Sequence, residues 1–255
     1  MEKKRTNPDS LTLIGHLDEL RVRIFYCIGF VVAAAFLSIS FSKQIIEFLK
    51  IPASKIIPGF IVLKPTEVIS VYIKVSLVAG IILASPALFY QFWKFIRPII
   101  EKRLQSGIIK WVISAAILFF IGTLFMYEIV LPFGLNFLMK MTEGIATPMI
   151  TLNAYISFVL AIIFIGGVIF EIPVISGILT SAGIITPFFM RKKRKEAIFF
   201  LFLIAAVITP TVDIFNMLLF ALPMTILYEA SIIVSMVIYK SKIQNKTEEV
   251  YAIEN

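Results

Sequence analysis

The most prominent pattern in the chain is a series of long apolar runs separated by short polar segments. A bilayer core of about 30 Å needs about 20 helical residues, so runs of this length predict membrane-spanning helices. We predict six of them, at residues 24–41, 68–92, 108–131, 154–179, 197–209 and 214–238. The fifth run is only about 20 Å long as a helix. A re-entrant hairpin over 197–238 is the alternative interpretation of the last two runs.

Prolines and polar residues mark where individual runs end or break. Pro132 is expected to close the third run, because proline lacks the N–H that helix bonding requires. Glu171 and Pro173 are expected to interrupt the fourth run. Between the last two runs, the segment from Pro210 to Asp213 predicts a tight turn.

Four segments outside the runs have predicted features of their own. Apolar residues at helical spacing within 45–49, in the longest loop, predict a short amphipathic helix on the outer surface. The same spacing over 13–24 predicts a membrane-surface helix before the first span. Aromatic residues concentrated at 89–95 are typical of an interfacial belt. Residues 1–240 are expected to form one domain, followed by a cytoplasmic tail at 241–255.

Composition agrees with a membrane protein and excludes several other classes. Hydrophobic residues make up 59% of the 255 residues and charged residues only 16%, and the mean hydropathy is +0.96. Soluble domains carry about 45–50% apolar and about 25% charged residues. A single soluble core of this size cannot hide such a surplus. Soluble enzymes, disordered chains and nucleic-acid binders are therefore poor fits, and the prediction is an all-α integral membrane protein.

The distribution of positive charge predicts the orientation. The chain has 24 Lys and Arg against 16 Asp and Glu, a net charge of +8. Eighteen of the 24 lie in the four segments 1–23, 94–110, 191–195 and 240–246, which six spans place on one side. Loops rich in Lys and Arg stay on the cytoplasmic side, so both termini are predicted to be cytoplasmic. The excess charge thus reports orientation and indicates no nucleic-acid partner.

Sequence motifs of catalysis and metal binding are absent. The chain contains no H-E-x-x-H, no G-x-S-x-G and no G-x-x-x-x-G-K-[ST] sequence. It has one cysteine and one histidine, too few for a disulfide or for the usual structural metal sites. We therefore predict that the protein is not an enzyme and needs neither a metal nor a cofactor.

Acidic residues inside the apolar runs are the strongest candidates for a functional site in the membrane. A carboxylate in hydrocarbon costs a few kcal/mol, so Glu171 is expected to face the bundle interior or a wet cavity. The alternative is a protonated or paired Glu171 that stabilises helix packing, with Lys74 as a possible partner. Glu229 interrupts the sixth run nearer to its end, where an interfacial position needs no special function.

On the cytoplasmic side, two further carboxylates suit a cationic ligand. Glu19 precedes the first span and Glu101 lies in the loop after the second. Because the planar guanidinium of arginine pairs bidentately with a carboxylate, two acidic residues suit a di-basic ligand. The alternative is that each forms an exposed ion pair with Arg23 or Arg97, worth about 0.5 kcal/mol or less. The residues alone do not choose between the two.

Five short stretches resemble, in order, motifs of the TatC family, the multispanning receptors of twin-arginine protein translocation. The stretch from His16 to Arg23 is similar to the family's H-L-x-E-L-R-x-R signature. The others are Phe89–Pro98 near the end of the second helix, Phe170–Val174 with a fourth-helix glutamate, Thr209–Asp213 at the last outer turn and Ala221–Pro223 in the sixth helix. The similarity as a whole covers essentially residues 10–240.

The resemblance implies a fold and a function. The expected fold is a cup-shaped bundle of six transmembrane helices with short fifth and sixth helices. The expected function is a receptor for twin-arginine signal peptides on folded cargo, working in a bacterial plasma membrane or an equivalent organelle membrane. Its expected partners are single-span proteins of the TatA/TatB type, membrane lipid and further copies of the same chain, and transport would be driven by the proton-motive force.

The resemblance also assigns candidate site residues. Signal-peptide binding falls to Glu19 and Glu101, with the motif residues His16, Leu20 and Arg21. Glu171 would face the concave membrane surface near a partner helix. Two other intramembrane candidates are Met217, which stands where the family often has glutamine, and Glu229; Pro52 and Asp213 would belong to the outer cap. The alternative function is a secondary carrier for a small solute or ion that uses Glu171, Glu229 and Lys74.

Overall fold

The computed structural model describes residues 13–57, 59–96, 108–145, 147–208 and 214–254, and it is almost entirely helical. Besides one isolated β-bridge between Ile61 and Thr151, the described elements are α1 (Leu13–Ile39), α2 (Ser42–Lys50), η1 (Ile51–Ala53), α3 (Pro65–Ile96), α4 (Ile108–Phe125), η4 (Met126–Val130), α5 (Leu131–Thr142), α6 (Leu152–Ile169), α7 (Ile172–Ser181), α8 (Pro187–Lys192), α9 (Arg194–Ile208) and α10 (Ile214–Glu254).

Within these described residues, five segments are long and apolar enough to cross a membrane. They are Leu17–Ile39, Pro65–Ile96, Ile109–Thr142, Leu152–Ser181 and Met217–Ile243. The predicted fifth span at 197–209 corresponds to α9, which has 15 residues and starts three residues earlier. The predicted sixth span at 214–238 and most of the predicted tail lie in one helix, α10, which continues past residue 240 to Glu254.

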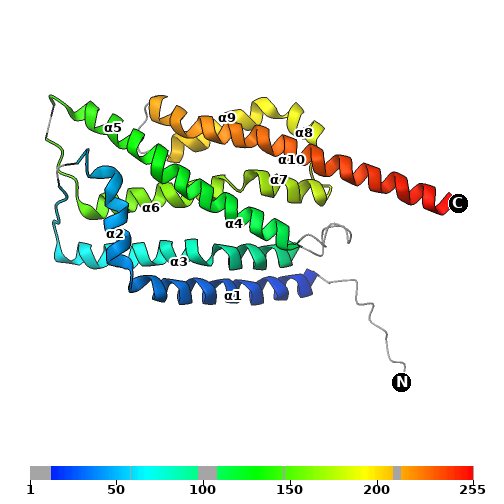
Figure 1. The fold of residues 1–255 in the computed structure, drawn as a ribbon, viewed down its shortest axis with the longest axis horizontal. Helices are drawn as coiled ribbons and strands as arrows, with labels where there is room; N and C mark the ends of the chain where they lie inside the picture. Colours follow the sequence, from blue (N-terminus) through cyan, green and yellow to red (C-terminus); the bar gives the residue numbers. More distant parts are fainter. Residues whose placement is uncertain (1–12, 58, 97–107, 146, 209–213, 255) are drawn as a thin grey trace, which may run out of the picture.

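The long helices run side by side and define two ends of the bundle (Figure 1). One end holds α2, the starts of α3 and α6, and the end of α5; we call it the α2 end. The opposite end holds the start of α1, the end of α3, the start of α4 and the end of α10. Helix α1 packs against α3. Helix α4 packs against both α3 and α6, and α10 packs against α7 and α9.

The first span differs from its predicted boundaries. A single helix, α1, covers both the predicted surface helix at 13–24 and most of the predicted span at 24–41. Residues 13–39 contain no proline, so nothing interrupts helical hydrogen bonding where the segment becomes uniformly apolar. Among the described side chains of α1 only Ser38 is buried, so this helix lies at the edge of the bundle.

The prediction that Pro132 ends the third helix is wrong. Helical structure continues from α4 through η4 and α5 to Thr142. Just before the proline, residues Met126–Val130 form a π-helical turn, whose wider i→i+5 bonding relieves the clash that a proline ring makes with the preceding turn. Pro132 then occupies the first turn of α5, where its missing N–H is tolerated.

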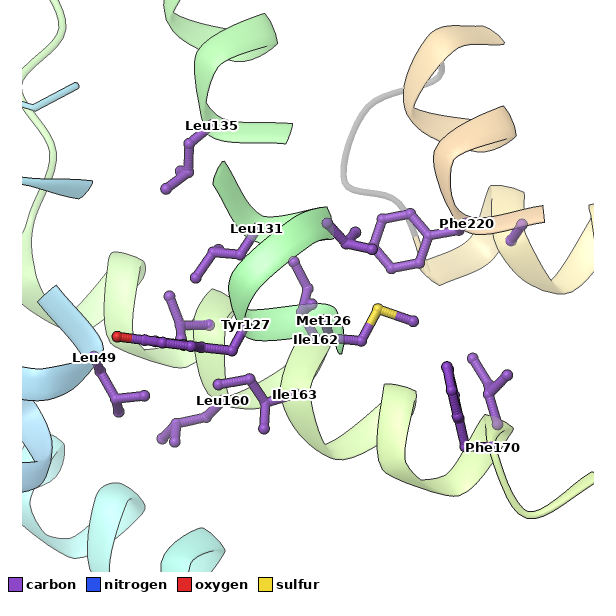
Figure 2. Packing of buried hydrophobic residues seen from close by; sticks show 14 of the residues in the cluster. Leu49, Met126, Tyr127, Leu131, Leu135, Leu160, Ile162, Ile163, Phe170 and Phe220 are labelled. Carbon is purple, nitrogen blue, oxygen red and sulfur yellow. The ribbon is translucent and has the colours of Figure 1, made fainter. Parts of the chain in front are cut away.

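The predicted break in the fourth span is confirmed. Helix α6 ends at Ile169, and α7 begins at Ile172 with Pro173 in its first turn. Phe170 and Glu171 form the connection. Buried residues of α6 contribute most to the main hydrophobic cluster, whose further members include residues of α2, α3, η4, α5, α9 and α10 (Figure 2).

The amphipathic helix predicted within 45–49 is confirmed as α2. Ser42, Ile46 and Leu49 are buried on its inner face. Two tyrosines fix its carboxyl end: the Tyr127 hydroxyl donates to the Phe48 carbonyl oxygen at 2.7 Å, and the Tyr155 hydroxyl donates to that of Leu49 at 2.6 Å. The Tyr127 ring also stacks on Phe48 with centroids 4.5 Å apart.

Candidate functional site

A hollow of about 500 Å³ lies between the first turns of α1 and the last turns of α3, at the end opposite α2. Its lining residues come from α1 and α3, the two helices that pack against each other. Its lining includes two acidic residues, Asp18 and Glu19, and two basic residues, Arg23 and Lys94. The uncharged lining residues are Val22, Tyr26 and Gln91. This mixture of charges can recognise a charged ligand.

Glu19 is the best-placed acid in this hollow. Its side chain is 29% exposed, and its Oε1 accepts a hydrogen bond from Arg23 Nη2 one turn along α1. Arg23 is only 11% exposed, so this ion pair is better shielded from water than an ordinary surface pair. The Arg23 Nε has no hydrogen-bond partner among the described residues. The Glu19 carboxylate in this hollow is thus already paired with one guanidinium, that of Arg23.

The other predicted members of this site are only partly described. Leu20 is half-buried, and the Arg21 guanidinium lies over the Phe25 ring, 5.9 Å from its centroid. His16 belongs to α1, but its side chain is not among those that the structure describes. Glu101 falls in 97–107, which lies outside the described residues. The structure thus places one of the two predicted carboxylates.

Glu171 lies at the α6–α7 break and is buried, with 6% of its surface exposed. It lines a largely apolar cavity of about 400 Å³ whose other walls come from α1, α3, α4, α6 and α7. Its Oε1 has no hydrogen-bond partner among the described residues. A buried carboxyl oxygen without a partner is costly, which makes Glu171 a candidate site residue.

Two tryptophans form one wall of the Glu171 cavity. Trp93 of α3 stacks on Trp111 of α4 with ring centroids 5.4 Å apart. Trp93 is 2% exposed, and its Nε1 also lacks a partner among the described residues. The same apolar cavity is therefore lined by two residues that each carry a buried polar atom without a partner among the described residues. Such a site can take a polar group carried on an apolar body, for example on a transmembrane helix.

The structure does not pair Lys74 with Glu171, which corrects the predicted alternative. The Lys74 Nζ instead donates to Asn153 Oδ1 and to Ser157 Oγ, both at 2.8 Å. Ser157 and Glu171 are 14 residues apart along α6 and its extension, about 21 Å. Lys74 and Glu171 are therefore at different depths of the bundle.

Glu229 does not line the Glu171 cavity and has a different partner. It accepts a hydrogen bond from Arg194 Nη2 at 2.7 Å, and both side chains are more than 40% exposed. Because Glu171, Glu229 and Lys74 are not brought together, the structure gives no support to a carrier site built from them.

The remaining predicted residues lie in separate places. Met217 is half-buried and packs against the main hydrophobic cluster. Pro52 is half-buried in η1 at the α2 end. Asp213 falls in 209–213, outside the described residues.

The basic run at 191–195 lies at the junction of α8 and α9 and is exposed. Lys193 Nζ donates to Glu196 Oε1 at 2.8 Å, and this bond lowers the pKa of the Glu196 carboxyl. An exposed pair of this kind contributes little to stability. The run is available to lipid headgroups or to solvent.

Sequence reasoning missed the residues that complete the two sites. Gln91 and Lys94 of α3 line the Glu19 hollow, although the signature motif lies entirely on α1. The aromatic cluster at 89–95 predicted an interfacial belt, and Tyr90 and Phe92 are indeed exposed, but Trp93 is buried. A signal for this was present, since residues 89, 93 and 96 share one helical face.

Comparisons with known proteins agree with each other. The family described as "Sec-independent protein translocase protein (TatC)" matches residues 15–223. A TatC protein of Aquifex aeolicus is 39% identical over 226 residues, which cover 87% of this chain and 93% of the relative. That of Escherichia coli K12 is 33% identical over 244 residues, covering 94% and 93%.

A solved structure is also similar. A crystal structure titled as the twin arginine translocase receptor TatC superimposes with a TM-score of 0.77 at 38% identity, covering 88% of this chain and 99% of that one. The match therefore extends over nearly the whole of the known structure.

Proposed function

Because this chain belongs to the TatC family and is thus a multispan membrane subunit of the Sec-independent protein translocase, we propose that its Glu19 hollow binds twin-arginine signal peptides. As a translocase subunit it is a transport protein and not an enzyme, in agreement with the sequence. The observation that carries the proposal is the half-buried Glu19 carboxylate, already paired with a guanidinium.

The proposed mode of binding is an exchange of guanidinium partners. Glu19 holds Arg23 within the hollow, so an arginine of the signal peptide competes with Arg23 for the same carboxylate. Asp18 lines the hollow beside it and adds negative charge. Glu101, with His16, Leu20 and Arg21 of the motif, completes the proposed site and supplies a carboxylate for the second arginine. Folded cargo remains in the cytoplasm while its peptide is bound.

The proposed topology has six spans with both termini in the cytoplasm, in a bacterial plasma membrane. Helices α9 and α10 supply the short fifth span and the sixth, and the whole forms a cup-shaped single domain over 1–240, followed by a cytoplasmic tail at 241–255. The distribution of cations supports this, because the start of α1, the end of α3 and the end of α10 share one end of the bundle (Figure 1). The α2 end then faces outward, with Pro52 and Asp213 in an outer cap.

The proposed role of the Glu171 cavity is to receive the transmembrane helix of a single-span partner of the TatA/TatB type. Its unpartnered Oε1 and the Trp93 Nε1 can bond a polar side chain on such a helix. Met217 and Glu229, on α10, are the other proposed contacts. Assembly with partners and further copies of the chain would then support export driven by the proton-motive force.

Crosslinking of a peptide with paired arginines tests the signal-peptide site. In membranes containing the full chain, Glu19→Ala and Glu101→Ala are each expected to reduce crosslinking about tenfold or more, because each removes a charged hydrogen-bond partner. Glu47→Ala is the matched control, since Glu47 is an exposed acid of α2 at the other end. A peptide with paired lysines should crosslink weakly to every variant. Unchanged crosslinking of the twin-arginine peptide to a variant that combines Glu19→Ala with Glu101→Ala would refute the proposed site.

A further inference from the structure

A cluster of three polar side chains at the α2 end belongs to neither proposed site. Lys74 of α3 donates from its Nζ to Asn153 Oδ1 and Ser157 Oγ of α6, each at 2.8 Å. All three side chains are half-buried. Among the described residues, no Asp or Glu forms an ion pair with Lys74. The cluster therefore places a lysine side chain inside a candidate membrane span with no carboxylate paired to it among the described residues.

The three side chains of this cluster have hydrogen-bond donors that their mutual bonds do not use. A lysine ammonium has three N–H donors, and two are used. Asn153 accepts from Lys74 through its Oδ1, so this bond leaves the two N–H donors of its Nδ2 unused. The Ser157 oxygen also accepts from Lys74, which leaves its own O–H to donate.

Other hydroxyls in the bundle are used differently. Ser76, two residues after Lys74, donates to the Tyr72 carbonyl oxygen at 2.8 Å, and Thr123 donates to that of Phe120 at 2.8 Å. Donation to the preceding turn is the usual arrangement for Ser and Thr within a helix. Ser157 makes no such bond to the described residues, so its O–H can still donate to another acceptor.

We propose that Lys74, Asn153 and Ser157 form a binding site for the phosphate of an anionic phospholipid. A phosphodiester offers anionic oxygens that can accept from the ammonium, the amide and the hydroxyl together. The site needs no contribution from the Glu19 hollow or from the Glu171 cavity. It is therefore independent of the proposed signal-peptide and partner sites.

The position of the cluster favours a lipid as the source of this phosphate. Lys74 is about 14 Å along α3 from its start, and Asn153 and Ser157 lie in the first two turns of α6, so the cluster is near the helix ends. A lysine at such a depth can reach a headgroup with its long side chain. One turn further in, Leu77 of α3 is 48% exposed and Ala161 of α6 is also exposed. These apolar surfaces suit the acyl chains of the same lipid.

Lipid retention by the purified full-length protein tests the proposal. Native mass spectrometry can compare phosphatidylglycerol with phosphatidylcholine of the same acyl chains, and with millimolar inorganic phosphate as a competitor. The wild-type protein is expected to retain phosphatidylglycerol preferentially. Lys74→Gln should weaken this retention about tenfold, the loss of one charge-assisted hydrogen bond. Lys140→Gln, which removes an exposed lysine at the same end, should leave it unchanged.

A second variant guards against misfolding of Lys74→Gln. Ser157→Ala keeps the charge and removes one donor, and it should weaken retention by a smaller factor, about threefold. Equal retention of the two lipids by the wild type, or full retention by both variants, would overturn the proposal. Displacement by inorganic phosphate would show that a free anion is the occupant and would overturn the lipid assignment. Displacement of the lipid by a single-span helix that carries a carboxylate would also overturn the lipid assignment.

Discussion

A glycine of α3, Gly80, packs directly against the backbone of α1 at Ala35, and replacing it gives a sharp prediction. A Cβ added at Gly80 would lie 2.6 Å from the Ala35 nitrogen and 2.7 Å from the Ala35 Cα. Ordinary contacts of a Cβ are 3.4–4 Å, so α1 would have to move away by about 1 Å. The obstacle is backbone, which cannot rotate aside as a side chain can. Gly80→Ala is therefore expected to separate α1 from α3.

The expected magnitude follows from the cost of overpacking. Inserting a methyl group into a close helix contact costs about 1–3 kcal/mol. Gly29→Ala provides the matched control, because Gly29 is also inside an apolar helix but a Cβ there meets nothing within 4 Å. Both substitutions share the gain in helix propensity, up to about 1 kcal/mol. The difference between them isolates the packing cost at Gly80.

Two measurements check this prediction. Thermal unfolding of the purified protein in detergent should show Gly80→Ala several degrees below the wild type, with Gly29→Ala at or above it. Because the Glu19 hollow lies between α1 and α3, Gly80→Ala should also weaken peptide crosslinking, whereas Gly29→Ala should not. If Gly80→Ala unfolds at the wild-type temperature and binds peptide normally, then the α1–α3 contact does not set the geometry of the hollow.

Two further predictions concern other parts of the bundle. Tyr155→Phe leaves the buried Leu49 carbonyl oxygen without its donor at 2.6 Å and should lower stability by about 1–3 kcal/mol, measured by thermal unfolding; Tyr72→Phe, on an exposed side chain, should have no effect. Glu171→Ala should reduce co-purification of a single-span partner from detergent, while Glu196→Ala, which breaks an exposed ion pair outside the proposed contacts, should leave it unchanged. Equal recovery of the partner with both variants would count against the Glu171 cavity.

The apolar pattern predicted the helices well, because burial in lipid or in the bundle requires long helical runs whatever their packing. It could not predict the path of the chain at Pro132. A proline ends a helix when the preceding turn is α-helical, and the π-helical turn at Met126–Val130 changes that condition. The energy that stabilises this turn comes from tertiary packing, since Met126 and Val130 are almost fully buried. No local pattern reports it.

The candidate sites show the same limit. Glu19 and Glu171 could be singled out because a carboxylate beside or inside an apolar run is rare and costly. The partner of Lys74 could not be predicted, because Asn153 and Ser157 are 79 and 83 positions away in the sequence and are chemically ordinary. Trp93 was expected at an interface, since composition alone does not distinguish a lipid-facing ring from one stacked against Trp111.

The attachment of α2 also has a consequence for biosynthesis. Helix α2 follows α1 directly, yet the tyrosines that bond its last carbonyl groups are 79 and 106 residues further along the chain. During synthesis, α1 and α3 can associate early, but the two bonds that hold the carboxyl end of α2 cannot both form until Tyr155 has emerged from the ribosome. The amino-terminal third of the protein is therefore completed only when its middle has been made.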